Sequence, residues 1–362
     1  MRVAEADCYD RAFNAPLQLT LGPLIGAIAG GNCAVVKPSE NGPSVAMIIG
    51  KIVEESLDAS CYRCLQGTAD AATALLELRW DKIFFTGNRT VGRSIAIKAA
   101  ETLTPVTLEL GGLNPAIVTK NANPALAAKR LLWAKASNAG QICTTQNYTL
   151  IHRDIRDAFI EGLRAAMQEF FPKGAKNSPE FARISTPAAF KRIVSLMQKT
   201  QGTKIMGGET DEASKFIEPT VYEVTNPSDP LMTEESFGPI LPIMVFDTLD
   251  NAIAIANKVD PTPLALYPFG NASEVEEIFQ RLQSGGASVN DGFIHSGLPT
   301  LAFGGVGKSG HGSYRGRASF DCFTHRRSYT TTPGWAERLI AFRYPSRTKS
   351  VITNSKPSFG RT

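Results

Sequence analysis

The sequence predicts an α/β protein built from a doubly wound parallel sheet and a second α/β domain. Short apolar segments alternate with helix-like segments along much of the chain, and this alternation gives parallel strands joined by right-handed crossovers. The 362 residues exceed what one simple core organises, so two domains are expected. A hydrophobic content of 43% with 20% charged residues is typical of globular proteins.

The first alternation predicts the doubly wound sheet. Residues 17–29 are apolar on most sides and end at Gly30-Gly31, as a buried helix with a glycine stop does. Residues 32–38 form a short apolar run that enters a proline turn, which predicts a fully buried strand. Further helices are predicted over residues 44–57, 70–78 and 90–100, and further strands over 62–65, 81–86 and 106–110.

The second alternation begins near Pro115. Strands are predicted over residues 116–119, 148–152, 240–246 and 287–290, and helices over 124–136, 156–170, 250–258 and 273–282. Residues 173–185 are polar and predict a loop, and residues 303–312 form a second, glycine-rich loop. Beyond about Tyr344 the pattern fades, and poor order is expected there.

Several polar residues follow the predicted strands of the first sheet. Ligands of doubly wound sheets bind beyond the carboxyl ends of the strands, so these residues are candidates for binding. They are Lys37 to Glu40, Gln66-Gly67, Thr86 to Asn88 and Glu109 to Gly112. The segment from Gly87 to Gly92 precedes a helix whose free N–H groups favour a phosphate, and Asn88 can cap that helix.

Glu109 and Cys143 are the residues best suited to chemistry. Glu109 ends an apolar strand-like run, and Cys143 closes the segment N-A-G-Q-I-C. Glycines lie within three residues of each, so a possible base and a possible nucleophile occur in loops with little side-chain bulk. The alternatives are a solvated carboxylate at a strand end and an ordinary buried thiol.

Charge and cysteine usage exclude several classes of protein. Residues 326–362 hold eight Arg or Lys and one acidic residue, Glu337, so this tail has a net charge of +7. The whole chain has a net charge of +4, and the residues before the tail therefore carry −3. The residues before the tail are therefore not expected to bind nucleic acid; the tail could contact an anionic surface or extend into solvent.

The pair Cys61 and Cys64 has no second pair that would complete a structural zinc site, and no metal is expected. Without a signal peptide or a long apolar run, a cytoplasmic protein without a transmembrane segment is expected.

The sequence resembles the aldehyde dehydrogenase superfamily, and most closely its class 3 branch. The resemblance runs from about Phe13 to Arg327 and rests on motifs whose order and spacing are together very specific. These are F-N-A-P (13–16), V-V-K-P-S-E (35–40), F-T-G-N-R-T-V-G (85–92), T-L-E-L-G-G (107–112), G-Q-I-C (140–143), E-E-S-F-G-P (234–239), L-A-L-Y (264–267), F-G-G-V-G-K-S-G (303–310) and G-S-Y-R-G (312–316).

The resemblance implies NAD(P)-dependent oxidation of an aldehyde to a carboxylic acid. In the family, a cysteine matching Cys143 forms a thiohemiacetal and then a thioester, and a glutamate matching Glu109 activates the hydrolytic water. The amide matching Asn14 and the backbone N–H of Cys143 would stabilise the oxyanion, a contribution worth about 10²–10³ in rate. Asn14 could instead be a turn former before Pro16.

The resemblance also implies the residues that bind NAD or NADP. Lys37 and Glu40 match contacts to the adenosine ribose, while Glu235 and Phe237 match residues at the nicotinamide ribose. The remaining matched positions are Gly87, Asn88, Gly92, Leu110 and Gly111. Arg89 replaces a common threonine and could add a cation near the phosphates or point into solvent. Taken alone, Glu234-Glu235 would be an exposed acidic pair, and His295 is expected to pack or line the substrate entrance rather than act as a base.

The resemblance implies that the chain is divided into three segments. They are an NAD(P)-binding domain over residues 1–111, a catalytic domain over 112–325 and an oligomerisation strand with a basic tail over 326–362. The family has a strand directly ahead of the asparagine, but residues 1–10 include four charged residues and no apolar run of strand length. The first domain is therefore expected to be truncated and incomplete at its N-terminus, without its central strand.

Two functions from different classes remain open on the sequence. The first is an active aldehyde dehydrogenase, a homodimer with a small-molecule aldehyde as substrate. The second is a degenerate, truncated homologue that binds at most another protomer. A narrower enzymatic alternative is hydrolysis of a thioester at Cys143 without cofactor, because that reaction needs the same thiol and oxyanion donors.

Overall fold

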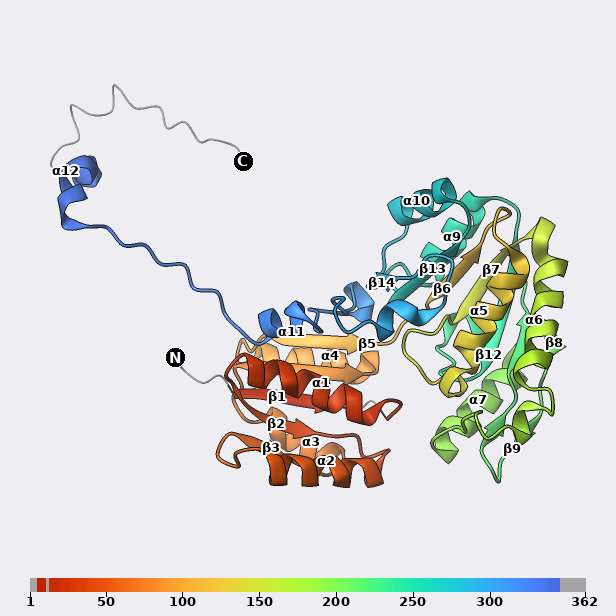
Figure 1. Ribbon diagram of the computed structural model, residues 1–362, viewed down its shortest axis with the longest axis horizontal. Coiled ribbons are helices and arrows are strands. Elements are labelled where there is room, and N and C mark those ends of the chain that lie inside the picture. Colours follow the sequence, from red (N-terminus) through yellow and green to blue (C-terminus); the bar gives the residue numbers. More distant parts are fainter. Residues whose placement is uncertain (1–4, 11–12, 346–362) are drawn as a thin grey trace. The chain divides into compact units, whose positions relative to one another are not determined.

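The computed structural model describes residues 5–10 and 13–345 (Figure 1). The chain divides into two compact units, residues 1–324 and residues 325–362, and each is described by itself. The predicted poor order beyond Tyr344 concerns residues 346–362, which lie outside the described part of the chain.

Among the described residues, the first sheet has six strands in the order β15-β5-β4-β1-β2-β3. All pairs are parallel except β15 with β5. The strands are β1 (Glu5–Asp10), β2 (Cys33–Lys37), β3 (Tyr62–Cys64), β4 (Lys82–Gly87), β5 (Val106–Leu110) and β15 (Gly310–His311). The helices around this sheet are α1 (Pro16–Ala29), α2 (Pro43–Ser56), α3 (Ala69–Leu76), α4 (Arg89–Ala100) and α11 (Arg317–Cys322).

Helices cover both faces of this sheet, as the doubly wound prediction requires. Adjacent residues of a strand point to opposite faces, and β4 shows this with two buried phenylalanines. Phe84 packs in one apolar cluster with α1 and α2, whereas Phe85 packs in another with α3 and α4. The predicted helices and strands of residues 17–110 are confirmed to within a few residues at their ends.

The central strand β1 corrects the prediction that residues 1–10 contain no strand of the sheet. β1 lies between β2 and β4 and pairs in parallel with both, from Glu5 opposite Cys33 to Asp10 opposite Thr86. A strand between two others finds partners for its N–H and C=O groups on both sides. That backbone pairing does not require an apolar run, and for this reason a search for apolar runs overlooked β1.

Among the described residues, the second sheet has seven strands in the order β14-β13-β6-β7-β12-β11-β8. These are β6 (Pro115–Val118), β7 (Tyr148–His152), β8 (Thr203–Met206), β11 (Thr220–Glu223), β12 (Ile240–Phe246), β13 (Ala265–Phe269) and β14 (Gly286–Ala287). The helices are α5 (Pro124–Ala136), α6 (Arg156–Phe170), α7 (Pro187–Lys199), α8 (Pro230–Thr233), α9 (Leu249–Val259) and α10 (Ala272–Arg281), and β9 (Thr210–Asp211) pairs with β10 (Phe216–Ile217) in a separate hairpin.

This sheet is also covered on both faces. Helices α5 and α6 pack on one face, whereas α7, α9 and α10 pack on the other. Our prediction assigned no element to residues 186–239, where α7 and the edge strands lie, and it missed β13. The strand predicted over 287–290 is shorter and shifted, at Gly286–Ala287.

The chain returns to the first sheet after completing the second. β15 pairs with β5 beside Glu109, and the Asn32 side chain donates a hydrogen bond of 2.8 Å to the Phe323 carbonyl. The first sheet therefore includes residues beyond position 111. The division into cofactor and catalytic domains at that position stays a prediction.

The second unit contains little regular structure in its described part. Three short helical turns follow an extended segment, and they are Gly334–Ala336, α12 (Glu337–Ile340) and Ala341–Arg343. The oligomerisation strand expected in this region stays a prediction. In the described part of the chain, no helix is both long enough and apolar enough to cross a membrane.

Gly310 holds β15 against the strand that carries Glu109. Its φ is +129°, and an added Cβ would lie 1.8 Å from the Leu108 carbonyl oxygen. We expect Gly310→Ala to lower the free energy of unfolding by about 3 kcal/mol or more, because both backbone strain and overlap oppose the side chain. Gly297→Ala, at a position with open space, should change it by less than about 1 kcal/mol. Chemical denaturation of both variants checks this prediction.

Candidate active site

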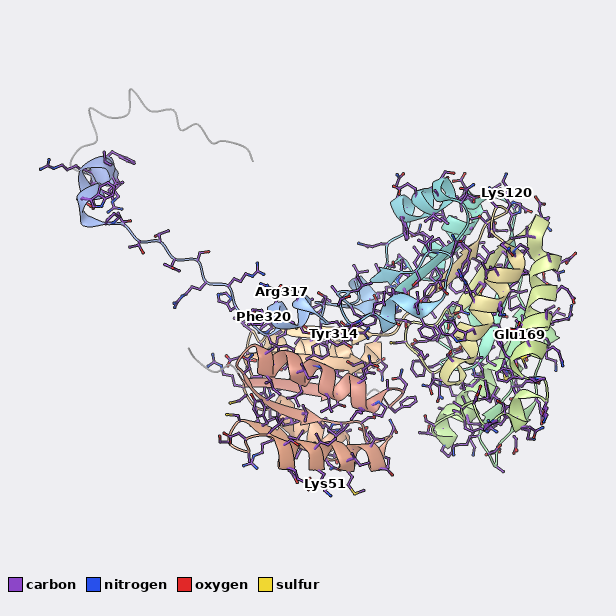
Figure 2. All side chains as sticks on the ribbon, in the orientation of Figure 1. Lys51, Lys120, Glu169, Tyr314, Arg317 and Phe320 are labelled. Atoms are coloured by element: carbon purple, nitrogen blue, oxygen red, sulfur yellow. The ribbon has the colours of Figure 1, made fainter. Side chains whose placement is uncertain are left out.

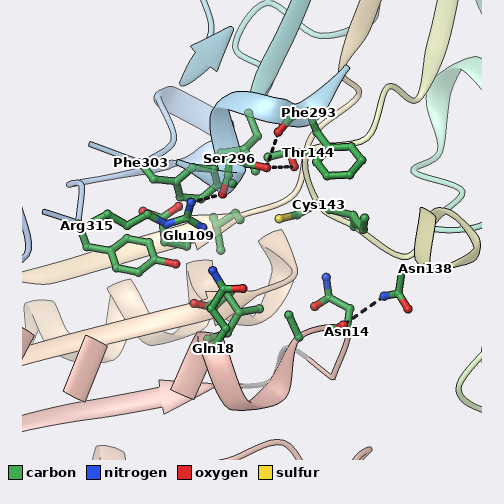
Figure 3. Close-up of a pocket in the computed structure, with 18 residues that line it drawn as sticks. Asn14, Gln18, Glu109, Asn138, Cys143, Thr144, Phe293, Ser296, Phe303 and Arg315 are labelled. Carbon is green, nitrogen blue, oxygen red and sulfur yellow. Dashed lines mark hydrogen bonds between the residues drawn. The ribbon is translucent and has the colours of Figure 1, made fainter. Parts of the chain in front are cut away.

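A cavity of about 350 Å³ contains the predicted catalytic residues (Figure 3). It is formed by the start of α1, the ends of β4 and β5, the loop before Thr144, and the segments near positions 293–297 and 303–315. The lining residues are Asn14, Ala15, Gln18, Leu19, Thr86, Glu109, Leu110, Asn138, Ile142, Cys143, Thr144, Leu264, Phe293, Ser296, Gly297, Phe303, Tyr314 and Arg315.

Cys143 is presented by a tightly bent loop. Asn138, Ala139 and Gly140 all have positive φ, and a Cβ at Gly140 would lie 2.2 Å from the Gly238 carbonyl oxygen. Only glycine fits such an approach without strain. The Asn114 side chain then donates to the carbonyl of Cys143 at 2.8 Å, which fixes the loop from the opposite side.

The Cys143 thiol is protonated at neutral pH. Burial, with smaller contributions from Glu235 and Glu109, raises its pKa to about 12, while Arg315 acts to lower it. The thiolate is the nucleophilic form of cysteine, so this site needs a base to remove the proton.

Glu109 lies one residue before the end of β5 as a buried carboxyl group, with only 4% of its surface exposed. Neither carboxylate oxygen has a hydrogen-bond partner among the described residues. Burial raises the pKa of Glu109 well above its usual range, and Arg315 opposes this shift. A carboxylate with a raised pKa is a stronger base when it is ionised, which suits proton transfer in the cavity.

Asn14 faces the same cavity from the segment before α1. Its side chain lines the cavity, and its backbone carbonyl accepts a hydrogen bond of 3.1 Å from the Asn138 side chain (Figure 3). This bond ties Asn14 to the loop that carries Cys143. The structure therefore brings Asn14, Glu109 and Cys143 together around one space.

Two residues matched to cofactor contacts lie at the end of β2. Lys37 is fully buried, and its Nζ donates to the Pro38 carbonyl at 3.2 Å and to the Glu40 carboxylate at 3.3 Å. Glu40 keeps 27% of its side chain exposed. Lys37 thus holds the Glu40 carboxylate at the carboxyl edge of the sheet, and neither residue lines the cavity around Cys143.

Further predicted residues lie at the ends of β4 and β5. Asn88 caps α4, as predicted, by accepting a hydrogen bond of 3.0 Å from the Val91 N–H. A Cβ at Gly92 would lie 2.6 Å from a methyl group of Leu110, so glycine permits the close approach of α4 to β5. Gly87 ends β4 directly before this capped helix.

Glu235 reaches the end of β5 from the loop between α8 and β12. A Cβ at Gly111 would lie 2.4 Å from a Glu235 carboxylate oxygen, and the Gly112 N–H donates to this carboxylate. Burial raises the pKa of Glu235 to about 7, and Arg89 opposes that rise. The alternative of an exposed acidic pair is therefore wrong for Glu235.

Glu235 shares a cavity of about 10 Å³ with two further residues of interest. One is Phe237, whose φ is +46°. The centre of its ring lies 5.7 Å from the centre of the Phe13 ring, and the two rings meet edge to face. The other is Lys135, whose pKa burial lowers to about 7. Sequence reasoning missed Lys135, because an isolated lysine in a helix gives no signal of burial.

Arg89 joins α4 to the residue that follows α9 instead of pointing into solvent. Its Nε donates to the Gly111 carbonyl at 3.2 Å, and its Nη2 pairs with Asp260. Asp260 is almost completely buried and also accepts from the Leu113 N–H at 3.2 Å. The guanidinium is thus engaged by protein groups at the junction of the two sheets.

We expect Arg89→Ala to lower the free energy of unfolding by about 2 kcal/mol, because it leaves the buried Asp260 without its cation. Lys129→Ala breaks an ion pair with Glu169 in which both side chains are about half exposed. That control should cost less than about 1 kcal/mol. Equal losses in the two variants, measured by chemical denaturation, would contradict the role given to Arg89.

Sequence reasoning also missed residues that complete the main cavity. Thr144 donates to the Ser296 hydroxyl at 3.1 Å, and Ser296 donates to the Phe293 carbonyl at 2.7 Å. Arg315 lies within the motif G-S-Y-R-G, but the motif by itself gives no indication that the arginine faces Cys143. In the described part of the chain, no cluster of three or more His, Cys, Asp or Glu residues could hold a metal.

His295 lies close to the cavity. Burial lowers its pKa to about 4, and its Nδ1 lies 2.9 Å from the Ser288 hydroxyl. A ring with so low a pKa is a weak base, and His295 is absent from the residues that line the cavity. Its packing role stays a prediction.

Two joined α/β sheets with a thiol and a carboxyl group in one cavity define a protein that has the groups needed for covalent catalysis. Residues 11–329 match the aldehyde dehydrogenase family, and the chain belongs to this family of oxidoreductases that act on aldehydes. A relative named beta-apo-4'-carotenal oxygenase, from Neurospora crassa, is 50% identical over 355 residues, which cover 96% of this chain and 67% of the relative. The human protein named aldehyde dehydrogenase family 3 member B1 is 42% identical over 92% of this chain and 71% of its own length, in agreement with class 3.

Solved structures agree with the fold. The substrate-bound AldH of Staphylococcus aureus superposes with a TM-score of 0.86 at 37% identity, over 93% of this chain and 76% of that one. An indole-3-acetaldehyde dehydrogenase in complex with NAD+ superposes with a TM-score of 0.81 at 28% identity, over 89% and 67% of the two chains. The chain thus spans about two thirds to three quarters of the length of these relatives.

Proposed function

We propose that this chain oxidises an aldehyde to a carboxylic acid with NAD or NADP, through a thiohemiacetal and a thioester on Cys143. The observation that carries this proposal is the placement of Cys143, Glu109 and Asn14 around one cavity. Membership of the aldehyde dehydrogenase family supports the reaction. The strand β1, which leads toward Asn14 and completes the centre of the first sheet, favours this function over a degenerate homologue.

The residues act in two steps. Glu109 removes the proton of the Cys143 thiol, the sulfur adds to the aldehyde carbon, and the Asn14 amide stabilises the resulting oxyanion. A bound nicotinamide would supply a hydride acceptor, and loss of that hydride would convert the adduct on Cys143 into a thioester. Glu109 releases its first proton to solvent and then takes a proton from water. The water oxygen adds to the thioester, the C–S bond breaks, and the acid and the Cys143 thiolate are released.

The described residues fit a nicotinamide dinucleotide. Its ribose needs polar groups, and Glu40, held by Lys37, offers a partly exposed carboxylate at the edge of the first sheet. Its phosphates need N–H donors, and the start of α4 lies at the same edge. Gly111 leaves the space in which the Glu235 carboxylate lies, beside the cavity of Cys143. Gly87, Gly92, Leu110 and Phe237 would support these contacts.

The cavity favours an apolar aldehyde. Leu19, Ile142, Leu264, Phe293 and Phe303 contribute apolar walls, and the relative from Neurospora crassa is named for a carotenal. We therefore propose an extended apolar aldehyde of the apocarotenal type as substrate, and a homodimer as the working form. Analytical ultracentrifugation would test the dimer.

Purified protein, an aldehyde, and NAD or NADP test this function. Reduced nicotinamide should form with an apocarotenal, and kcat/KM should be higher for it than for a short aldehyde such as propanal. No reduction with any aldehyde and either cofactor would favour the non-catalytic alternative. Hydrolysis of an acyl thioester without cofactor, together with no aldehyde oxidation, would favour the hydrolase alternative.

A further inference from the structure

Arg315 is held rigidly at the wall of the cavity. Its Nη1 donates to the Ser296 carbonyl, and its guanidinium lies 4.4 Å from the centre of the Phe303 ring. Its φ of +80° is unusual for a residue with a side chain, and its backbone N–H donates to the Ser319 hydroxyl at 2.7 Å. Such strain persists only where the surroundings enforce it, so the cation is fixed before any ligand arrives.

The charges that face Arg315 are few. Among the described residues that line the cavity, Arg315 is the only Lys or Arg. Two other titratable neighbours are neutral at pH 7, since burial lowers the pKa of His295 to about 4 and raises that of Tyr314. The guanidinium acts electrostatically on Glu109 and on Cys143, while Glu235 adds negative potential at Cys143.

The need for such a cation follows from the burial of the two reacting groups. Both oxygens of Glu109 are buried, and no described residue hydrogen-bonds to them. An isolated buried carboxylate or thiolate is unfavourable without a compensating charge. One guanidinium can compensate one negative charge, but it cannot compensate a carboxylate and a thiolate together.

We propose that Arg315 is a positioning residue that balances one negative charge shared between Glu109 and Cys143. When the proton passes from sulfur to carboxylate, an S–H bond breaks and an O–H bond forms. The charge of the three groups stays at zero, because the anion moves from oxygen to sulfur while the cation remains. This inference rests on the proposed roles of Cys143 and Glu109 and adds a residue that sets how readily the proton moves.

The test measures thiolate formation directly, without substrate or cofactor. Iodoacetamide alkylates the thiolate, and mass spectrometry of the Cys143 peptide follows the rate at that residue alone as a function of pH. The variants are Arg315→Met, Arg315→Lys and the control Arg317→Met. Arg317 lies two residues further along, is 76% exposed, and its guanidinium also lies over a ring, that of Phe320 at 5.5 Å (Figure 2).

Arg315→Met should slow alkylation of Cys143 at pH 8 by about tenfold or more, because a rise of one pKa unit removes nine tenths of the thiolate. Arg315→Lys should recover most of the rate, and Arg317→Met should equal the wild type. In a Glu109→Gln background, alkylation should become faster, and adding Arg315→Met should slow it again. These five results together support the shared charge.

Other outcomes overturn the inference. An unchanged alkylation profile in folded Arg315→Met and Arg315→Lys would mean that Arg315 only shapes the cavity. A loss of turnover confined to aldehydes that carry a carboxylate would instead make Arg315 a substrate contact. Failure of the proposed function is distinguishable whatever the alkylation profile shows, because either the wild type would then oxidise no aldehyde with NAD or NADP, or Cys143→Ser would retain that oxidation.

Discussion

Cys143→Ala should abolish the formation of reduced nicotinamide, with kcat/KM lower by about 10⁴-fold or more. Removing the nucleophile removes both covalent steps, and neither Glu109 nor Asn14 can replace a thiolate that adds to the aldehyde. Stopped-flow or steady-state absorbance of the reduced cofactor measures the loss. The variant should still fold, because the change removes a single sulfur from a partly buried position.

A matched control for Cys143→Ala is Cys61→Ala. Cys61 is also a free thiol, but it lies just before β3 and lines no part of the cavity. Its replacement should leave kcat/KM within about twofold of the wild type. Retention of activity in Cys143→Ala, or loss in Cys61→Ala, would contradict the assignment of the nucleophile.

Glu109→Gln should lower kcat by about 10²–10⁴-fold and leave a rapid first turnover of reduced nicotinamide. The amide cannot take a proton from water, so thioester hydrolysis becomes limiting. Because burial raises the pKa of Glu109, the wild-type kcat should rise as pH increases through that value. This rise of kcat with pH should be absent from the pH profile of Glu109→Gln.

The same carboxyl should affect stability with a defined sign. Its pKa is higher in the folded protein than in the unfolded chain, so the folded state binds the proton more tightly. The stability associated with this proton is fully present below the unfolded pKa and is lost as pH rises through the folded pKa. Glu109→Gln should therefore unfold at a higher temperature than the wild type at alkaline pH. A lower unfolding temperature there would contradict the burial of an unpaired carboxyl.

Much of the fold could be predicted because its segments carry local signals. The helix at Pro16–Ala29 is apolar on most sides, and the strand at Cys33–Lys37 is a short apolar run. β1 could not be predicted in this way, because its place depends on pairing with two strands that come later in the chain. The short strand β15 depends in the same way on contact with β5 across two hundred residues.

The residues of the candidate site also differ in whether a local motif or a distant contact determines their place. Asn14, Glu109 and Cys143 lie in motifs, and the structure places all three around one cavity. Arg315 and Arg89 acquire their surroundings from distant parts of the chain, namely Ser296 and Asp260. No local pattern states that these two guanidinium groups are engaged inside the protein, so the sequence left Arg89 open and gave Arg315 no role.

Trapping the acyl-enzyme tests the central claim most directly. Glu109→Gln protein is mixed with NAD and an aldehyde at alkaline pH, quenched in acid within the first turnover, digested and analysed by mass spectrometry. The account predicts one acyl group on the peptide that contains Cys143, formed in proportion to the reduced cofactor and absent without NAD. Reduced cofactor without any acyl group on Cys143, in the variant or in the wild type quenched during turnover, would contradict it.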